Sequence, residues 1–137
     1  MTNDTVTHVW DDRFGAVIDR ADAQCLEIRW YDTTASMSAS EFQDWLAGFA
    51  SEVERRKRPG ILVDATSFRM DPANMNEQWR DENITPHYNA GVVRKFAFHM
   101  PDGMPAIGGS PEREGPADFL TAYFGHRQDA LDWLASG

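Results

Sequence analysis

The sequence is short of cysteine and of long apolar runs, and both shortages exclude classes of protein. Cys25 is the one cysteine among 137 residues, so no disulfide can form within the chain. Such cysteine usage is typical of a reducing compartment, and we expect a cytoplasmic protein. No apolar run approaches the length of about 18 residues that a membrane-spanning helix needs, and the N-terminus shows no signal peptide.

Positive charge is also scarce. Lys and Arg number 13 against 22 Asp and Glu, which gives a formal net charge of −9. Because an acidic surface repels phosphate backbones, we expect no nucleic-acid partner. One basic run exists, from Arg55 to Arg58. At the end of a predicted helix it would interact favourably with the helix dipole, and the alternative is a contact with a membrane or an anion.

Several enzyme and cofactor motifs are missing. There is no phosphate-binding glycine loop, no His-Glu-x-x-His, no Gly-x-Ser-x-Gly and no Cys-x-x-Cys. The histidines lack the spacing of metal ligands; they are His8, His87, His99 and His126. We therefore expect no cofactor, no metal site and no catalytic residue.

The first thirty residues have the alternation of short strands, which are expected at 7–10, 14–19 and 26–31. In the third, apolar Leu26, Ile28 and Trp30 alternate with charged residues. A period of two indicates a strand with one buried face, so Glu27 and Arg29 are expected on the other face.

A helix is predicted after this meander, because Ser38 and Glu41 have the spacing of a capping box. Apolar residues follow at helical spacing and form one face: Phe42, Trp45, Leu46, Phe49 and Val53. Pro59 ends this helix, and residues 61–63 then form a short strand that is buried on both sides.

A second helix is predicted from Asp71-Pro72, since an aspartate followed by a proline is typical of a helix N-terminus. Met75 and Trp79 lie four residues apart on this helix. Thr85-Pro86 breaks or restarts it, and Gly91 ends it.

The remaining elements complete an α/β fold: a strand at 92–99, a Gly- and Pro-rich loop at 100–116, a strand at 119–124 and a closing helix around 130–134. The middle βαβαβ part requires parallel strands. We therefore predict a single domain over residues 1–137. Its mixed sheet has antiparallel N-terminal strands and a parallel βαβαβ core, with helices packed on the sheet.

Asp64 and His99 stand at the carboxyl ends of two neighbouring strands, where ligands of open α/β sheets bind. There they would work as an acid/base pair in a small enzyme. The alternative is structural: Asp64 caps a nearby turn or helix, and His99 only begins the loop.

The loop at 100–116 is long for a plain connection, and such loops often cover a functional site. Beneath it, Trp79, His87, Tyr88 and Met104 are candidates to line an amphipathic pocket. The five Trp, eight Phe and three Tyr supply such a lining, although the same residues are typical of ordinary core packing.

Three segments resemble a known family: RPGILVDATSF, AGVVRKFAF and AYFGHRQDALDWLAS. They are similar to the bacterial SpoIIAA-like family, whose members have a STAS-type α/β fold related to CRAL-TRIO lipid-binding domains. Members end in an aromatic strand residue, a short polar cap and Ala-x-x-Trp-Leu. These are here Phe124 and the segment from Ala130 to Leu134.

The resemblance implies a non-catalytic binding or regulatory module. Its ligand would be a small amphipathic molecule or a membrane surface near the carboxyl ends of the parallel strands. The candidate ligand-binding residues are then Asp64, Ser67, Trp79, His87, Tyr88, His99 and Met104.

Family antagonists of anti-sigma factors are phosphorylated on a serine after the central strand. Thr66 and Ser67 stand at that place, without the glycine turn that usually follows, so a phosphorylated partner-binding switch is an alternative. A homodimer is a further expectation, because exposed aromatic residues are typical of interfaces.

Overall fold

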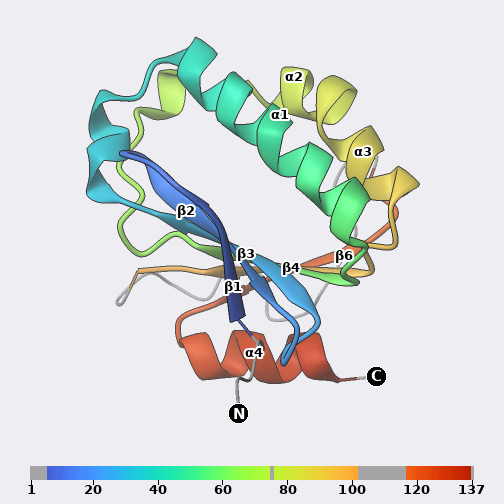
Figure 1. Cartoon of the computed structure of the whole chain (residues 1–137). Helices are drawn as coiled ribbons and strands as arrows, with labels where there is room; N and C mark the ends of the chain where they lie inside the picture. The colour runs from blue at the N-terminus through green and yellow to red at the C-terminus, as the bar shows by residue number, and fades with distance from the viewer. Residues whose placement is uncertain (1–5, 75, 102–116, 137) are drawn as a thin grey trace.

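Six strands form one sheet with helices on both faces (Figure 1). The computed structural model describes residues 6–74, 76–101 and 117–136. The strands lie in chain order across the sheet: β1 (Val6–Asp11), β2 (Gly15–Arg20), β3 (Cys25–Trp30), β4 (Gly60–Asp64), β5 (Lys95–His99) and β6 (Leu120–Phe124). β1 to β3 are antiparallel and β3 to β6 are parallel, which confirms the predicted mixed α/β fold.

Helix α1 (Ala39–Arg56) begins at the predicted capping box. The Ser38 hydroxyl accepts a hydrogen bond from the Glu41 amide at 3.1 Å, and the Glu41 carboxylate accepts one from the Ser38 amide at 2.9 Å. The helix ends at Lys57, whose backbone is left-handed with a φ of 55°. Its apolar face packs onto the sheet, as the helical spacing predicts.

The segment after β4 differs from the prediction. Asp71-Pro72 begins only a short 3-10 turn over Pro72–Asn74, where the Asp71 carboxylate accepts a hydrogen bond from the Ala73 amide at 3.0 Å. Helix α2 (Glu77–Asn83) begins after Asn76, whose side chain accepts a hydrogen bond from the Trp79 amide at 2.9 Å. The sequence analysis placed the start at Asp71 and missed Asn76, a residue type that favours helix N-termini as strongly as Asp does.

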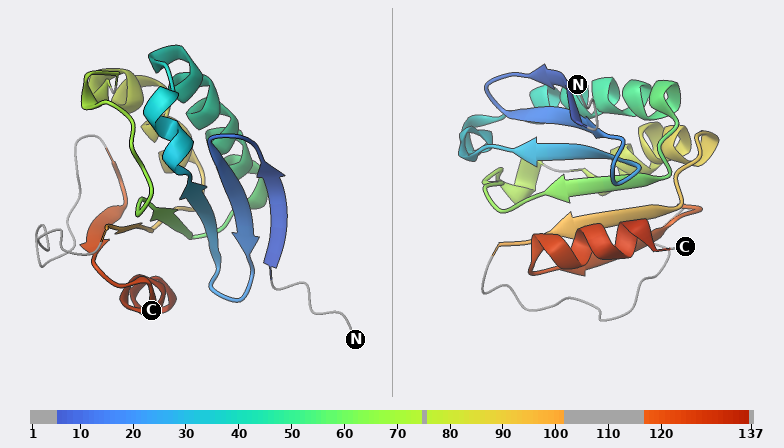
Figure 2. Two further views of the ribbon diagram at one scale, coloured as in Figure 1. Left: turned by 90° about the vertical axis from the view of Figure 1, so that its left-hand side faces the viewer. Right: turned by 60° about the horizontal axis from the view of Figure 1, so that its bottom comes forward.

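Helices α1, α2 and α3 cover one face of the sheet, and α4 (Arg127–Ala135) covers the other (Figure 2). Helix α3 (Thr85–Ala90) has Pro86 in its first turn and ends at Gly91, as predicted. The α1 face holds the larger core, which is rich in aromatic side chains, whereas smaller residues such as Leu62 and Ala97 pack against α4. Gly60 allows close packing there, because a Cβ atom would come within 3.2 Å of the Leu134 side chain.

One further prediction needs adjustment, and another cannot be compared with the described residues. Strand β5 begins at Lys95 instead of residue 92. The predicted loop at 100–116 lies outside the described residues from residue 102 onward, and so does Met75. Among the helices that are described, none is long and apolar enough to cross a membrane.

Candidate functional site

Asp64 and His99 lie side by side at the carboxyl ends of β4 and β5. They are partners in the parallel pairing, and Arg29 of β3 pairs with Asp64 on its other side. The His99 Nδ1 atom lies 3.9 Å from Asp64 Oδ1, and Arg29 Nε lies 4.0 Å from Asp64 Oδ2. Leu62 and Ala97, two residues earlier, pack against α4, so Asp64 and His99 are on the α4 face as well.

The Asp64 carboxylate is already engaged in a turn. Its Oδ1 atom accepts hydrogen bonds from the Thr66 amide at 3.1 Å and from the Thr66 hydroxyl at 2.6 Å. This is the structural role that the sequence offered as one of two alternatives.

The His99 imidazole has an unused nitrogen next to this carboxylate. Its Nδ1 atom is buried and, within the described part of the chain, is the one buried side-chain nitrogen or oxygen atom without a hydrogen-bond partner. At 3.9 Å the Asp64–His99 pair is too far apart for a hydrogen bond. The fold thus places the two acid/base candidates next to each other, but no hydrogen bond connects them.

Glu27 lies on the same face, surrounded by three arginines. Arg127 of α4 donates to both Glu27 oxygens at 2.9 and 2.7 Å, Arg29 donates at 3.3 Å, and Arg20 donates through Nε. Burial raises the pKa of Glu27, but the hydrogen bonds from Arg127 and Arg20 outweigh burial and hold the pKa below its usual range.

The expectation that only one face of β3 is buried is therefore wrong at Glu27, whose side chain is 0% exposed. Strand alternation predicted it as the solvent side, because the pattern contains no information on what covers that face. The cover is Arg127, which is 100 positions away in the chain.

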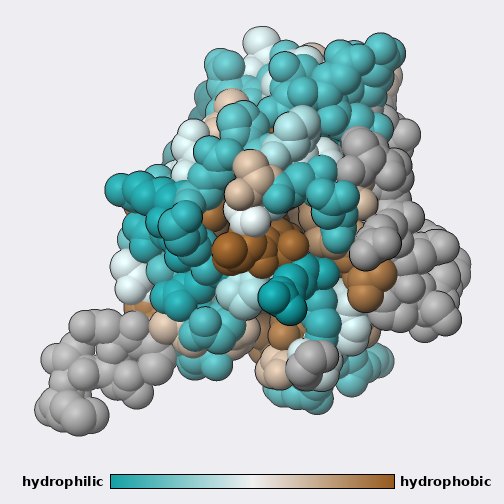
Figure 3. Space-filling model, turned by 90° about the vertical axis from the view of Figure 1, so that its right-hand side faces the viewer, coloured by the Kyte–Doolittle hydropathy of each residue, from teal (hydrophilic) through white to brown (hydrophobic). Residues whose placement is uncertain are grey.

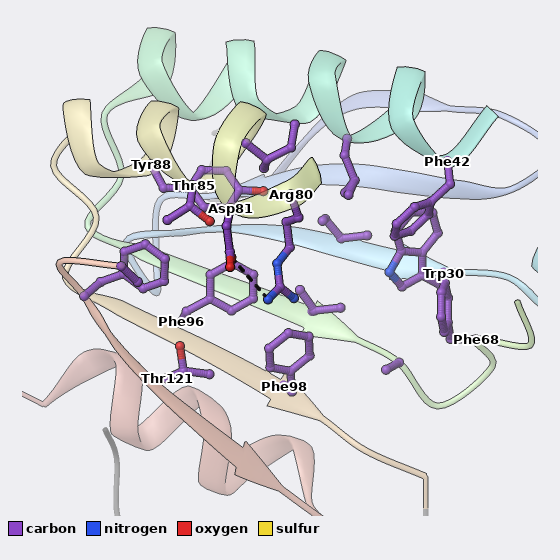
Figure 4. A pocket seen from close by; sticks show the side chains of 17 residues that line it. Trp30, Phe42, Phe68, Arg80, Asp81, Thr85, Tyr88, Phe96, Phe98 and Thr121 are labelled. Atoms are coloured by element: carbon purple, nitrogen blue, oxygen red, sulfur yellow. Dashed lines mark ion pairs between the residues drawn. The ribbon is translucent and has the colours of Figure 1, made fainter. Parts of the chain in front are cut away.

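A cavity of about 140 Å³ lies on the opposite face of the sheet, under the helices α1 to α3 (Figure 4). Apolar residues form most of its wall. The aromatic ones are Trp30, Phe42, Phe68, Tyr88, Phe96, Phe98 and Phe119. Trp30, Val63 and Ala65 place part of the cavity at the carboxyl ends of the parallel strands.

Four polar residues also line the cavity: Arg80, Asp81, Thr85 and Thr121. Arg80 and Asp81 extend from α2 toward the sheet, and Thr121 lies below them on β6 (Figure 4). Arg80 and Asp81 form an ion pair in which Arg80 Nη2 is 3.6 Å from Asp81 Oδ1, longer than a hydrogen bond (dashed line in Figure 4). Both threonines are buried at 5% exposure.

Of the candidate pocket residues, Tyr88 lines the cavity. It is buried, and burial raises the pKa of its hydroxyl above the usual range. Trp79 and His87 are not part of the wall. Trp79 packs half-buried against the core, and the exposed His87 places Nδ1 3.1 Å from Glu54 Oε1.

The structure thus distributes the candidate ligand-binding residues over both faces of the sheet. Asp64 and His99 are on the α4 face, and Tyr88 is on the α1 face. Thr66 and Ser67 are half-buried in the segment after β4. Met104 lies outside the described residues.

Arg80, Asp81 and Thr121 were missed by reasoning from the sequence. Adjacent charges in a short helix are usually solvated, and a threonine in a strand is ordinary. Only the position of α2 above the sheet brings them to one cavity.

No protein-family model, no curated protein and no solved structure matches this chain. The likeness to the SpoIIAA-like family therefore stays a prediction from the sequence. A functional assignment has to rest on the two sites described above.

Proposed function

We propose that this protein is a non-catalytic binding module that holds a small amphipathic ligand in the cavity under α1, α2 and α3. The supporting observation is the lining, in which aromatic and aliphatic walls meet four polar side chains. Ligand sites are typically concave and mostly apolar, with a few polar groups that fix the orientation of the ligand.

The size of the cavity limits the ligand. An engineered apolar cavity of roughly 150 Å³ binds benzene, so a cavity of about 140 Å³ has room for one six-membered ring or a short chain. Drug-sized ligands need roughly 300 Å³ or more. The proposed ligand is therefore small, with one apolar group and a polar end.

A small ligand is better supported than a membrane surface. Among the described residues, the large hydrophobic side chains that are exposed are Val6, Val92 and Leu120, which belong to three separate segments. On the side shown in Figure 3, the hydrophobic area is small and hydrophilic side chains lie around it. Membrane-binding surfaces require a broad apolar face, usually with basic residues.

An enzyme that uses Asp64 and His99 has weaker support. Their position at the strand ends and the unpartnered His99 nitrogen favour it. Against it, Thr66 already occupies Asp64 Oδ1, and a general base must reach its proton at about 3 Å. The enzyme alternative would require a catalytic activity of the wild type that is lost in His99→Gln.

Three other expectations stay predictions: the phosphorylated partner-binding switch, the likeness to the SpoIIAA-like family and the cytoplasmic location. Thr66 donates its hydroxyl to Asp64, so a phosphate there would first have to break that contact. Membership in the SpoIIAA-like family agrees with a binding role. The cytoplasmic location rests on the cysteine content alone, since Cys25 is the one cysteine in the sequence.

A cavity-filling variant tests the function. Ala65 lines the cavity, and Ala65→Leu should fill part of it, whereas Ala47→Leu on the exposed side of α1 is a matched control. We expect benzyl alcohol to raise the Tm of the wild type and of Ala47→Leu, because binding to the folded state stabilises it, but not of Ala65→Leu.

The comparison uses the change in Tm on adding benzyl alcohol, so a lower starting Tm of Ala65→Leu does not affect it. The same rise in all three proteins would contradict the cavity as the binding site. No rise in the wild type, together with co-sedimentation with phosphatidylcholine vesicles, would favour the membrane alternative.

A further inference from the structure

Two opposite charges at the cavity form an ion pair with each other. Arg80 and Asp81 are neighbours on α2, and their closest contact is 3.6 Å, beyond hydrogen-bond distance. Their side chains are 41% and 35% exposed. The ion pair is the one contact of their side-chain hydrogen-bonding groups within the described part of the chain, and because it is long and partly exposed, a ligand can exchange it for its own hydrogen bonds.

Both charged groups are directed at the same cavity. In Figure 4 the Arg80 guanidinium extends down toward the ring of Phe98, and a dashed line marks its ion pair with the Asp81 carboxylate. The cavity wall thus presents a cation and an anion beside an apolar space. A guanidinium fits a carboxylate in two parallel hydrogen bonds, and a carboxylate accepts readily from an ammonium group.

A ligand with a single charge satisfies only half of this arrangement. A simple carboxylate would pair with Arg80 but would lie close to the like charge of Asp81. A simple amine would pair with Asp81 but would lie close to Arg80. A neutral ligand would partly desolvate the ion pair and supply no hydrogen bond to either group, which costs free energy.

We propose that the cavity binds a free α-amino acid with an aromatic or similarly sized apolar side chain. Its carboxylate pairs with Arg80, its ammonium group pairs with Asp81, and its ring occupies the apolar space. The volume of about 140 Å³ is close to that of a cavity that holds one benzene ring. This inference rests on the proposed function and names the chemical class of its ligand.

Four compounds with the same phenylethyl skeleton separate the contributions. Phenylalanine has both charges, 3-phenylpropanoate has only the carboxylate, 2-phenylethylamine has only the ammonium group, and ethylbenzene has neither. Each is titrated into the full-length protein by NMR or calorimetry at one salt concentration. We expect phenylalanine to bind with a Kd lower by roughly tenfold or more than any of the other three.

Two variants assign the charges. Arg80→Gln should remove the advantage that the carboxylate provides, and Asp81→Asn should remove the advantage of the ammonium group. Both residues are partly exposed, so both variants should fold, which thermal unfolding checks. Arg69→Gln and Asp44→Asn are matched controls at exposed positions outside the cavity wall and should leave all four affinities unchanged.

The outcomes distinguish this inference from the proposed function. If ethylbenzene binds in the cavity but phenylalanine binds no more tightly, the amino-acid inference is wrong and the binding module stands. If 3-phenylpropanoate binds best and Asp81→Asn strengthens it, the ligand is a carboxylate and the inference is again wrong. If none of the four binds, the proposed function itself fails.

Discussion

At the scale of single residues, Glu27 is the most informative side chain. It is buried with no exposure, and its charge is compatible with burial only because Arg20, Arg29 and Arg127 surround it. Removing one partner of a buried ion pair is strongly destabilising, since it leaves uncompensated charge in a poorly solvated place.

We predict that Glu27→Gln lowers the free energy of unfolding at pH 7 by about 3–5 kcal/mol, because the arginines lose their anion while the side-chain volume is kept. Chemical denaturation followed by circular dichroism measures the loss. Glu82→Gln is the control; it changes an exposed side chain and should stay within about 0.5 kcal/mol of the wild type.

The same variant has a defined pH dependence. The pKa of Glu27 lies below its usual range in the folded state, so its contribution is complete above the unfolded pKa of about 4.3. The contribution is lost as the pH falls through the folded pKa. The difference between wild type and Glu27→Gln should therefore be constant near neutral pH and should shrink on acidification; a difference that grows would contradict this account.

At the scale of elements, the parts of the sequence with local signals were predicted well. The capping box placed the start of α1 correctly, and period-two alternation located β3. Features that depend on contacts between distant parts of the chain could not be predicted from the sequence. The cover of Glu27 comes from α4, and the choice between Asp71 and Asn76 as a helix start depends on how the chain docks on the sheet.

The capping box supplies a prediction at this scale. Ser38→Ala removes the acceptor of the Glu41 amide and should lower the free energy of unfolding by about 1 kcal/mol. Ser51→Ala in the middle of the same helix is the control and should not destabilise, because alanine favours a helix interior. Equal effects of the two variants in denaturant unfolding would show that the cap does not stabilise α1.

At the scale of the whole molecule, the fold class follows from the order of elements, but the cavity does not. His87 and Tyr88 are adjacent, yet consecutive residues on a helix point about 100° apart, so only one of them faces the cavity. Which one it is depends on how α3 is rotated against the sheet. From the sequence, Tyr88 was correctly predicted to line a pocket. The polar wall residues Arg80, Asp81 and Thr121 were not predicted.

The central claim is that the space on the α1 face, and not the α4 face, binds a small ligand. Methyl NMR during separate titrations with phenylalanine and with ethylbenzene tests it most directly. Ile28, Val63 and Ile84 line the cavity, whereas Leu62 and Leu134 pack on the α4 face and serve as internal controls. We predict that at least one of the two ligands causes saturable shifts at the first three methyl-bearing residues and none at the two leucines. Shifts confined to the leucines, or no shifts with either ligand, would contradict the account.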